Sequence, residues 1–124
     1  MKKLFFSIFS TATLISSASS ACMDPGAKRI DTKAALVEYG NNASFNACAA
    51  EMKAVGVKLN SKDTYIYRKD RDANSNDPVI YQLLIMGMDG QKKMVKIKLS
   101  YDLRNHAFTC ADGIDYRITR GGCF

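Results

Sequence analysis

The clearest alternation of apolar and polar side chains runs from residue 94 to residue 101. One set of alternate positions is apolar and the other is polar: Val95, Ile97, Leu99 and Tyr101 against Lys96, Lys98 and Ser100. A period of two predicts a strand with one face on a core and the other toward solvent. The longer apolar run over residues 79–88 predicts a central strand buried on both faces. Between them, Asp89-Gly90 predicts a tight hairpin turn.

An earlier part of the chain has helical periodicity. Asp31 or Thr32 caps a helix over residues 32–38, because a short side-chain oxygen accepts from the unpaired N–H groups of the first turn. Gly40-Asn41-Asn42 then predicts an end or a sharp bend, since Gly and Asn tolerate positive φ. A second helical segment follows and stops at Gly56. Its apolar residues have the spacing of one helix face: Phe45, Cys48, Ala49 and Met52.

The order of elements predicts the fold class. Residues 64–67, 107–110 and 116–119 are expected as short strands, and residues 22–30 as an irregular lead-in. Helical segments followed by a run of strands predict an α+β domain. We expect an N-terminal helix, whole or broken into two, packed on a four- to five-stranded antiparallel meander. The alternative is a strongly curled, barrel-like sheet with the helix plugging one end. The order is similar to that of cystatin-like domains, a resemblance of shape without a shared motif.

The first 21 residues have the composition of a secretory signal peptide. Lys2 and Lys3 precede a mostly apolar stretch over residues 4–15, and small residues fill positions 16–21. The apolar stretch is shorter than the roughly 20 residues of a transmembrane helix. We therefore expect cleavage after Ala21, which leaves residues 22–124 as a single domain that is periplasmic or secreted.

The cysteines all follow the predicted cleavage site: Cys22, Cys48, Cys110 and Cys123. An even number of cysteines in an exported chain predicts two disulfides. Proximity in sequence favours Cys22–Cys48 and Cys110–Cys123, although all three ways of pairing four cysteines remain open. Cys22 at the new N-terminus also raises the alternative of a lipoprotein. The small residues before it fit a lipoprotein signal, but the Leu of that signal is missing. Acylation of Cys22 would also leave one of the other three cysteines unpaired. We therefore favour a protein whose Cys22 is not acylated.

One loop has the composition of a calcium site, with oxygen-bearing side chains at alternate positions. These are Asp70, Asp72, Asn74 and Asn76. Ser75 stands where the sharp turn of a calcium loop has Gly, and Tyr81 where it has the closing Glu. Asp and Asn are also common at hairpin tips, because they tolerate turn conformations. We therefore predict a polar hairpin tip, with neither a metal nor a cofactor bound.

Catalytic chemistry has few candidate residues in this sequence. His106 is the only histidine, and its neighbours predict a surface turn without an adjacent base or nucleophile. The cysteines show no C-x-x-C spacing, so neither a redox pair nor a zinc knuckle is indicated. A small secreted hydrolase that uses His106 is therefore an alternative, and the leading expectation is that the protein is not an enzyme.

The formal net charge is +6, and removal of the two signal-peptide lysines lowers it to about +4. This modest charge argues against a nucleic-acid partner, and it allows peripheral contact with an acidic envelope surface. We expect a protein partner, docked on tyrosine anchors and steered by basic residues. The expected contacts are Tyr65, Tyr67, Arg68, Arg71, Lys96 and Lys98, with Tyr101 and Tyr116 as further anchors. An inhibitor or immunity protein against a secreted hydrolase is the most concrete version. A lipid-anchored envelope assembly factor, held through Cys22, is the alternative.

Overall fold

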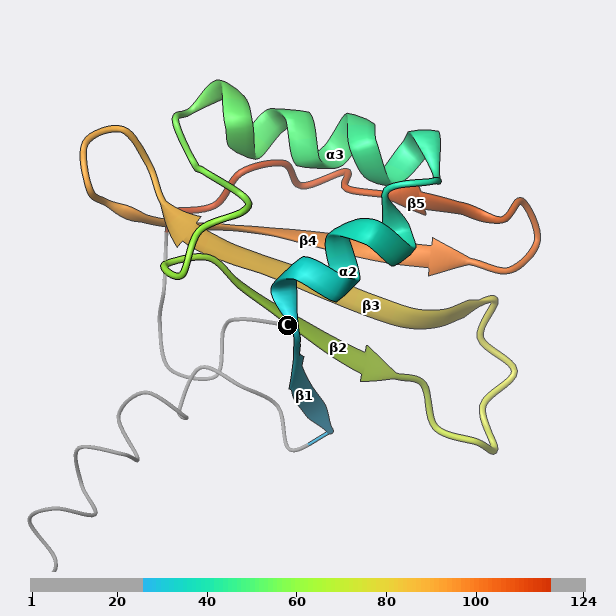
Figure 1. The fold of residues 1–124 in the computed structure, drawn as a ribbon. Helices are drawn as coiled ribbons and strands as arrows, with labels where there is room; N and C mark the ends of the chain where they lie inside the picture. The colour runs from blue at the N-terminus through green and yellow to red at the C-terminus, as the bar shows by residue number, and fades with distance from the viewer. Residues whose placement is uncertain (1–25, 117–124) are drawn as a thin grey trace, which may run out of the picture.

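The computed structural model describes residues 26–116. Over these residues the chain forms a five-stranded antiparallel sheet in the order β1-β2-β3-β4-β5. Two helices, α2 and α3, lie over one face of the sheet (Figure 1). The elements are β1 Ala27–Ile30, α2 Thr32–Tyr39, α3 Ala43–Ala54, β2 Tyr65–Asp70, β3 Val79–Met88, β4 Met94–Asp102 and β5 Ala107–Thr109. The predicted α+β class, with helices packed on a meander, is confirmed. The predicted signal peptide lies outside the described residues.

The helical region is broken where the sequence predicted it. Asp31 caps α2, with its carboxylate accepting from Ala34 N at 2.9 Å. Asn42 caps α3 in the same way, accepting from Ser44 N at 2.9 Å. Gly40 ends α2 with a φ of −64°, so the break does not use the positive φ that glycine allows. The side-chain cap of Asn42, rather than a left-handed residue, therefore marks the division between α2 and α3.

The core lies between α3 and the inner face of the sheet. The buried residues of α3 are those of the predicted apolar face, Phe45, Cys48, Ala49 and Met52. The strands supply alternate residues that are 0 % exposed: Ile66, Leu83, Ile85, Val95, Ile97 and Leu99. Pairing aligns Ile66 with Ile85 and Ile85 with Ile97, so one row crosses three strands beneath the helix. The alternation in the sequence thus assigned the inner face of β4 correctly.

The expected irregular lead-in was wrong for its last four residues. Ala27–Ile30 forms β1, an edge strand paired with β2 from Ala27 opposite Lys69 to Ile30 opposite Ile66. Two of its four residues are basic, and the segment has no apolar alternation. Its conformation follows from the partner strand, because β2 presents backbone groups that β1 can pair with. The sequence of β1 alone gives no such signal.

The turn between β3 and β4 also differs from the expectation. Asp89-Gly90 does not form a two-residue turn, since residues 89–93 make a longer loop closed by Asp89 N donating to Lys93 O at 2.9 Å. The Asp89 carboxylate accepts from Gln91 N and Lys93 N, each at 2.8 Å. Lys92 takes the left-handed conformation, with a φ of +63°. The aspartate side chain, rather than the glycine, therefore shapes this hairpin.

Candidate functional site

The outer face of the sheet, opposite the helices, carries four of the six predicted binding residues. Strand pairing places Tyr67 beside Arg29 on one side and Leu84 on the other, and Leu84 beside Lys98. The next row runs from Tyr65 through Met86 to Lys96. Tyr65, Tyr67 and Lys98 are each half-buried. The prediction that the two tyrosines share one face is confirmed, and both belong to a face that also carries Arg29.

The basic part of this face is not the open surface that the sequence suggested. Lys96 is only 4 % exposed, and its neighbours Leu84 and Met86 are 0 % and 8 % exposed. Backbone hydrogen bonds of 2.9 and 2.8 Å join Lys96 to Asp115, so the chain returns along β4 at this point. Lys96 therefore does not lie on the open surface from which it was expected to steer a partner. Lys98 remains as the accessible lysine of that pair.

Arg68 is also used within the protein. Its side chain lies on the helix side, where Nη1 donates to the Tyr39 hydroxyl at 2.7 Å and Nε to Asp70 Oδ1 at 2.8 Å. The guanidinium lies 3.8 Å from the centre of the Tyr81 ring. Burial lowers the pKa of Arg68, but the hydrogen bonds to Asp70 and Tyr39 outweigh burial and raise the pKa overall. Arg68 therefore joins β2 to α2 through Tyr39.

Arg68 ends a row of stacked planar groups. The Tyr81 and Tyr101 rings are stacked with centroids 4.8 Å apart, so Tyr101 belongs to this cluster instead of forming a separate anchor. Burial raises the pKa of Tyr81, which keeps its phenol neutral. The Tyr101 hydroxyl lies 3.4 Å from Nδ1 of His106, which is exposed and has a φ of +51°. The described contacts of His106 thus include a phenol and no carboxylate.

The loop after β2 is held by its own side chains. The Arg71 guanidinium donates to the Asp77 carbonyl, and the Asp77 carboxylate accepts from Val79 N at 2.9 Å. Asp70, the first residue of the calcium pattern, pairs with Arg68 at 2.8 Å. The other candidates, Asp72, Asn74 and Asn76, are exposed. Within residues 26–116 no three His, Cys, Asp or Glu side chains come together as a metal site would require.

A cleft of about 530 Å³ lies where β1 runs into α2, beside the loop that precedes β2. Its lining comprises Arg29, Ile30, Asp31, Thr32, Lys33, Asn60, Ser61, Lys62 and Thr64. Three of these residues are cationic and one is acidic. The acid, Asp31, already accepts the capping hydrogen bond of α2. Among described residues, neither Lys33 nor Lys62 forms an ion pair.

Arg29 links the cleft to the outer face of the sheet. Its guanidinium lies 4.2 Å from the centre of the Tyr65 ring. A cation over an aromatic face is held without losing its charge, because the ring offers partial negative charge and no proton acceptor. The structure therefore places a predicted anchor, Tyr65, beside a cation that the sequence did not single out.

The net positive charge of residues 26–116 lies in the two segments that contribute most of the lining of this cleft. These residues include fourteen Lys and Arg and eleven Asp and Glu. Segments 28–33 and 58–63 hold five of the basic residues and two of the acidic ones: Lys28, Arg29, Lys33, Lys58 and Lys62, with Asp31 and Asp63. The excess of three in these two segments equals the whole excess, so the rest of the described surface is balanced. Sequence reasoning missed this cluster because the two segments meet only through the fold.

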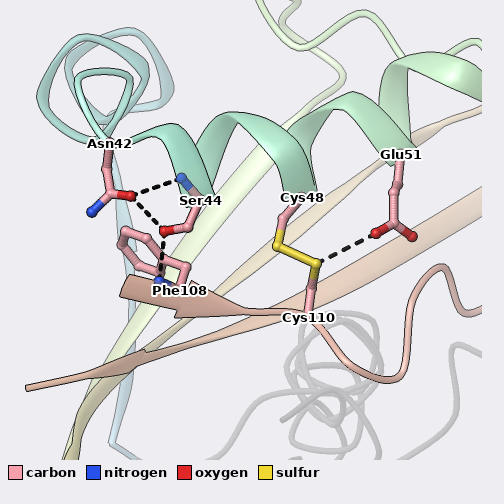
Figure 2. Close-up of a disulfide and its surroundings, with 6 residues drawn as sticks. All are labelled: Asn42, Ser44, Cys48, Glu51, Phe108 and Cys110. Carbon is pink, nitrogen blue, oxygen red and sulfur yellow. Dashed lines mark hydrogen bonds between the residues drawn. A yellow bond between two sulfur atoms is a disulfide. The ribbon is translucent and has the colours of Figure 1, made fainter. Parts of the chain in front are cut away.

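The helices are attached to the sheet by a disulfide between Cys48 on α3 and Cys110 after β5 (Figure 2). Their Cα atoms are 6.0 Å apart and the residues are 62 positions apart in the chain. This bond overturns the favoured pairings Cys22–Cys48 and Cys110–Cys123. Cys48 lies on the inner face of α3 and therefore meets the sheet, which sequence proximity could not reveal. Cys22 and Cys123 lie outside the described residues.

Comparison with protein-family models, with curated proteins and with solved structures found no match for this chain. Among residues 26–116, no helix is both long and apolar enough to span a membrane.

Proposed function

We propose that this chain is an exported binding protein that docks on an acidic surface of a partner protein. An inhibitor or immunity protein that guards against a secreted hydrolase is the most concrete version. The observation that carries the proposal is the net positive charge of segments 28–33 and 58–63, which contribute the residues of the cleft and which, within residues 26–116, hold the whole excess of basic over acidic residues. Because the other described residues together carry no net charge, this cleft is where we expect an acidic partner to be attracted.

The neighbouring residues suit an interface. Arginine and tyrosine are enriched among the residues that contribute most to binding, because they bury large areas and retain a polar group. Arg29 and Tyr65 are stacked at the edge of the cleft, so both are partly ordered before a partner arrives. Ordering in advance lowers the entropy that binding must overcome. We assign the anchor role to this pair and the steering role to Lys33 and Lys62.

The scaffold beneath the cleft is rigid, which supports the same proposal. The Thr32 hydroxyl donates to Thr64 O at 3.1 Å, and the Thr64 hydroxyl donates to Lys58 O at 2.7 Å. These bonds tie the start of α2 to the loop on the other side of the cleft. Thr64 is 2 % exposed, so the tie is shielded from water. The backbone segments that carry Lys33 and Lys62 are thereby joined across the cleft.

The experiment begins with capture of partners from envelope extract on the immobilised mature protein. The captured protein is then purified and its binding kinetics are compared for two double variants. Lys33→Glu with Lys62→Glu reverses the cleft, and Lys53→Glu with Lys93→Glu makes the same charge change elsewhere on the surface. Rim charges act mainly on the association rate and are screened by salt. We expect the cleft variant to associate more than about ten-fold more slowly at low salt, with a smaller effect at high salt.

The control variant separates a specific cleft from general charge attraction. It should bind at close to the unaltered rate, because its lysines lie outside the cleft. Equal slowing by both double variants would mean that net charge alone attracts the partner. No slowing by the cleft variant would place the interface elsewhere. Either result contradicts the proposed site.

A further inference from the structure

The Glu51 carboxylate lies against the Cys48–Cys110 disulfide. Glu51 Oε2 is 3.4 Å from the sulfur of Cys110, the contact marked by a dashed line in Figure 2. Glu51 follows Cys48 by three residues on α3, which brings the two side chains to neighbouring positions on the helix. A sulfur within a disulfide carries no proton to donate. The carboxylate oxygen of Glu51 therefore lies beside the disulfide although no hydrogen bond from the disulfide holds it there.

The two cysteines differ in exposure. Cys48 is 3 % exposed beneath α3, whereas Cys110 is half-buried at the end of β5. Reduction of a disulfide begins when a thiolate attacks one sulfur and the other leaves. Because Cys110 is the more exposed residue, we expect an external thiolate to attack its sulfur. Glu51 therefore stands beside the sulfur that an attacking thiolate would approach.

The turn after β5 leaves room for this carboxylate. Gly113 N donates to Cys110 O at 2.9 Å, and Gly113 has a φ of +65°. A Cβ at position 113 would lie 3.4 Å from Glu51 Oε1, at van der Waals contact distance. Glycine at this position therefore suits the left-handed backbone of the turn. The other carboxylate oxygen of Glu51 lies beside Cys110.

We infer that the negative charge of Glu51 slows the attack of thiolates on the Cys48–Cys110 disulfide. In the attack, a bond forms between the incoming sulfur and Cys110 Sγ, and the bond between the two protein sulfurs breaks. The electron pair leaves on Cys48 Sγ, which takes a proton from water. A second thiol then displaces Cys110 as its thiol, so that the reductant is oxidised and both cysteines are reduced. The transition state is anionic throughout, and a neighbouring carboxylate raises its energy.

The test compares Glu51→Gln with the unaltered mature protein. Two unit charges about 4 Å apart in water repel by about 1 kcal/mol, which corresponds to about a five-fold change in rate. We expect dithiothreitol to reduce this disulfide about five-fold faster in Glu51→Gln. The rate is followed by differential alkylation and mass spectrometry of the peptides that contain Cys48 and Cys110. Glu38→Gln, on the exposed side of α2, makes the same substitution away from the disulfide and should leave the rate unchanged.

Thiols of different charge separate an electrostatic role from a structural one. The acceleration in Glu51→Gln is expected to be largest for anionic 2-mercaptoethanesulfonate, intermediate for 2-mercaptoethanol and smallest for cationic cysteamine. Glu51→Lys should extend the same trend. An equal acceleration with all three thiols would show that the substitution only loosens the structure. An unchanged rate would show that the contact has no effect, and either outcome overturns the inference.

Discussion

Gly56 and Gly90 meet backbone against backbone where α3 reaches the turn between β3 and β4. A Cβ placed on Gly56 would lie 2.6 Å from Gly90 N and 2.9 Å from Gly90 Cα. Gly90 N donates to Val55 O at 3.0 Å, so the approach is fixed by a hydrogen bond. Gly56 also has a φ of +96°. The C-terminal end of α3 is therefore attached to a hairpin, as its middle is attached to the sheet by the disulfide.

Gly56→Ala is expected to lower the free energy of unfolding by about 1–3 kcal/mol, because a left-handed non-glycine residue is strained. The backbone of Gly90 cannot move aside as a flexible side chain could, so the strain is not relieved. Urea unfolding followed by circular dichroism measures the change. Gly26→Ala is the control, since its Cβ would meet only the Lys69 side chain at 3.9 Å. Equal stability of the two variants would contradict the described contact.

Ser44→Ala should destabilise the attachment of α3 to β5. The Ser44 hydroxyl accepts from Phe108 N at 2.7 Å and donates to the Asn42 carboxamide, as Figure 2 shows. The N–H of the buried Phe108 would lose its partner, at a cost of about 1–3 kcal/mol. Thermal unfolding measures the loss of stability in Ser44→Ala. Ser75→Ala, in the loop over residues 71–77, is the control. The Ser75 hydroxyl also accepts a hydrogen bond, from Asp77 N at 3.1 Å, but Asp77 is exposed and water can replace this bond, so the loop variant is expected to lose less stability than Ser44→Ala.

The described disulfide leaves one pairing for the other two cysteines, if two disulfides form. We predict that peptide mapping under non-reducing conditions finds Cys48 linked to Cys110 and Cys22 linked to Cys123. Replacing Cys48 and Cys110 together by Ala is expected to cost about 4 kcal/mol, the chain-entropy value for a loop of this length. A Cys22–Cys48 peptide from the native protein would contradict both the mapping and the structure.

The loop over residues 70–77 is expected not to bind calcium. Asp70 is paired with Arg68, and the Asp77 carboxylate is engaged by Val79 N, so the turn already uses two of its carboxylates. Melting temperatures with calcium and with a chelator should agree within error. A rise of several degrees in calcium, lost in Asp72→Ala, would show that the alternating oxygens do bind the ion.

His106→Ala is expected to leave partner binding unchanged, because His106 lies at a turn outside the cleft lined by Arg29, Lys33 and Lys62. Its hydrogen-bond partners in the structure are the Tyr101 hydroxyl and, through its carbonyl, the Asn42 side chain. Lys98→Glu, on the outer face, should reduce the association rate less than reversal of the cleft does. Binding kinetics with the captured partner measure both. Loss of function in His106→Ala alone would favour the hydrolase alternative.

The periodicity of the sequence predicted the elements in which hydrophobic spacing within the segment shows which side chains are buried. The inner face of α3 and the alternating residues of β4 follow from hydrophobic spacing, since a residue facing the core must be apolar whatever its neighbours in space. The break at residues 40–42 follows from Asn42, whose side chain caps the next helix. These features require no knowledge of which segments meet.

The remaining features depend on contacts between distant segments. β1 is a strand because β2 pairs with it, and Lys96 is buried although it occupies a polar position in the alternation. The Cys48–Cys110 bond joins residues 62 positions apart, and the basic cleft joins two segments that no local pattern connects. Arg68 was taken for a surface charge because nothing nearby in sequence shows that Tyr39 lies above it.

The disulfide between α3 and the end of β5 has a further consequence for the chain as a whole. The exposed loop over residues 71–77 lies between the two linked cysteines in sequence, and loops of this kind are where proteases cut most readily. A single cut there divides the polypeptide into one fragment with Cys48 and another with Cys110. The two fragments stay in one covalent molecule, with the helices still fastened to the strands, until a reductant separates them. A nicked molecule and an intact one would then differ in size only after reduction.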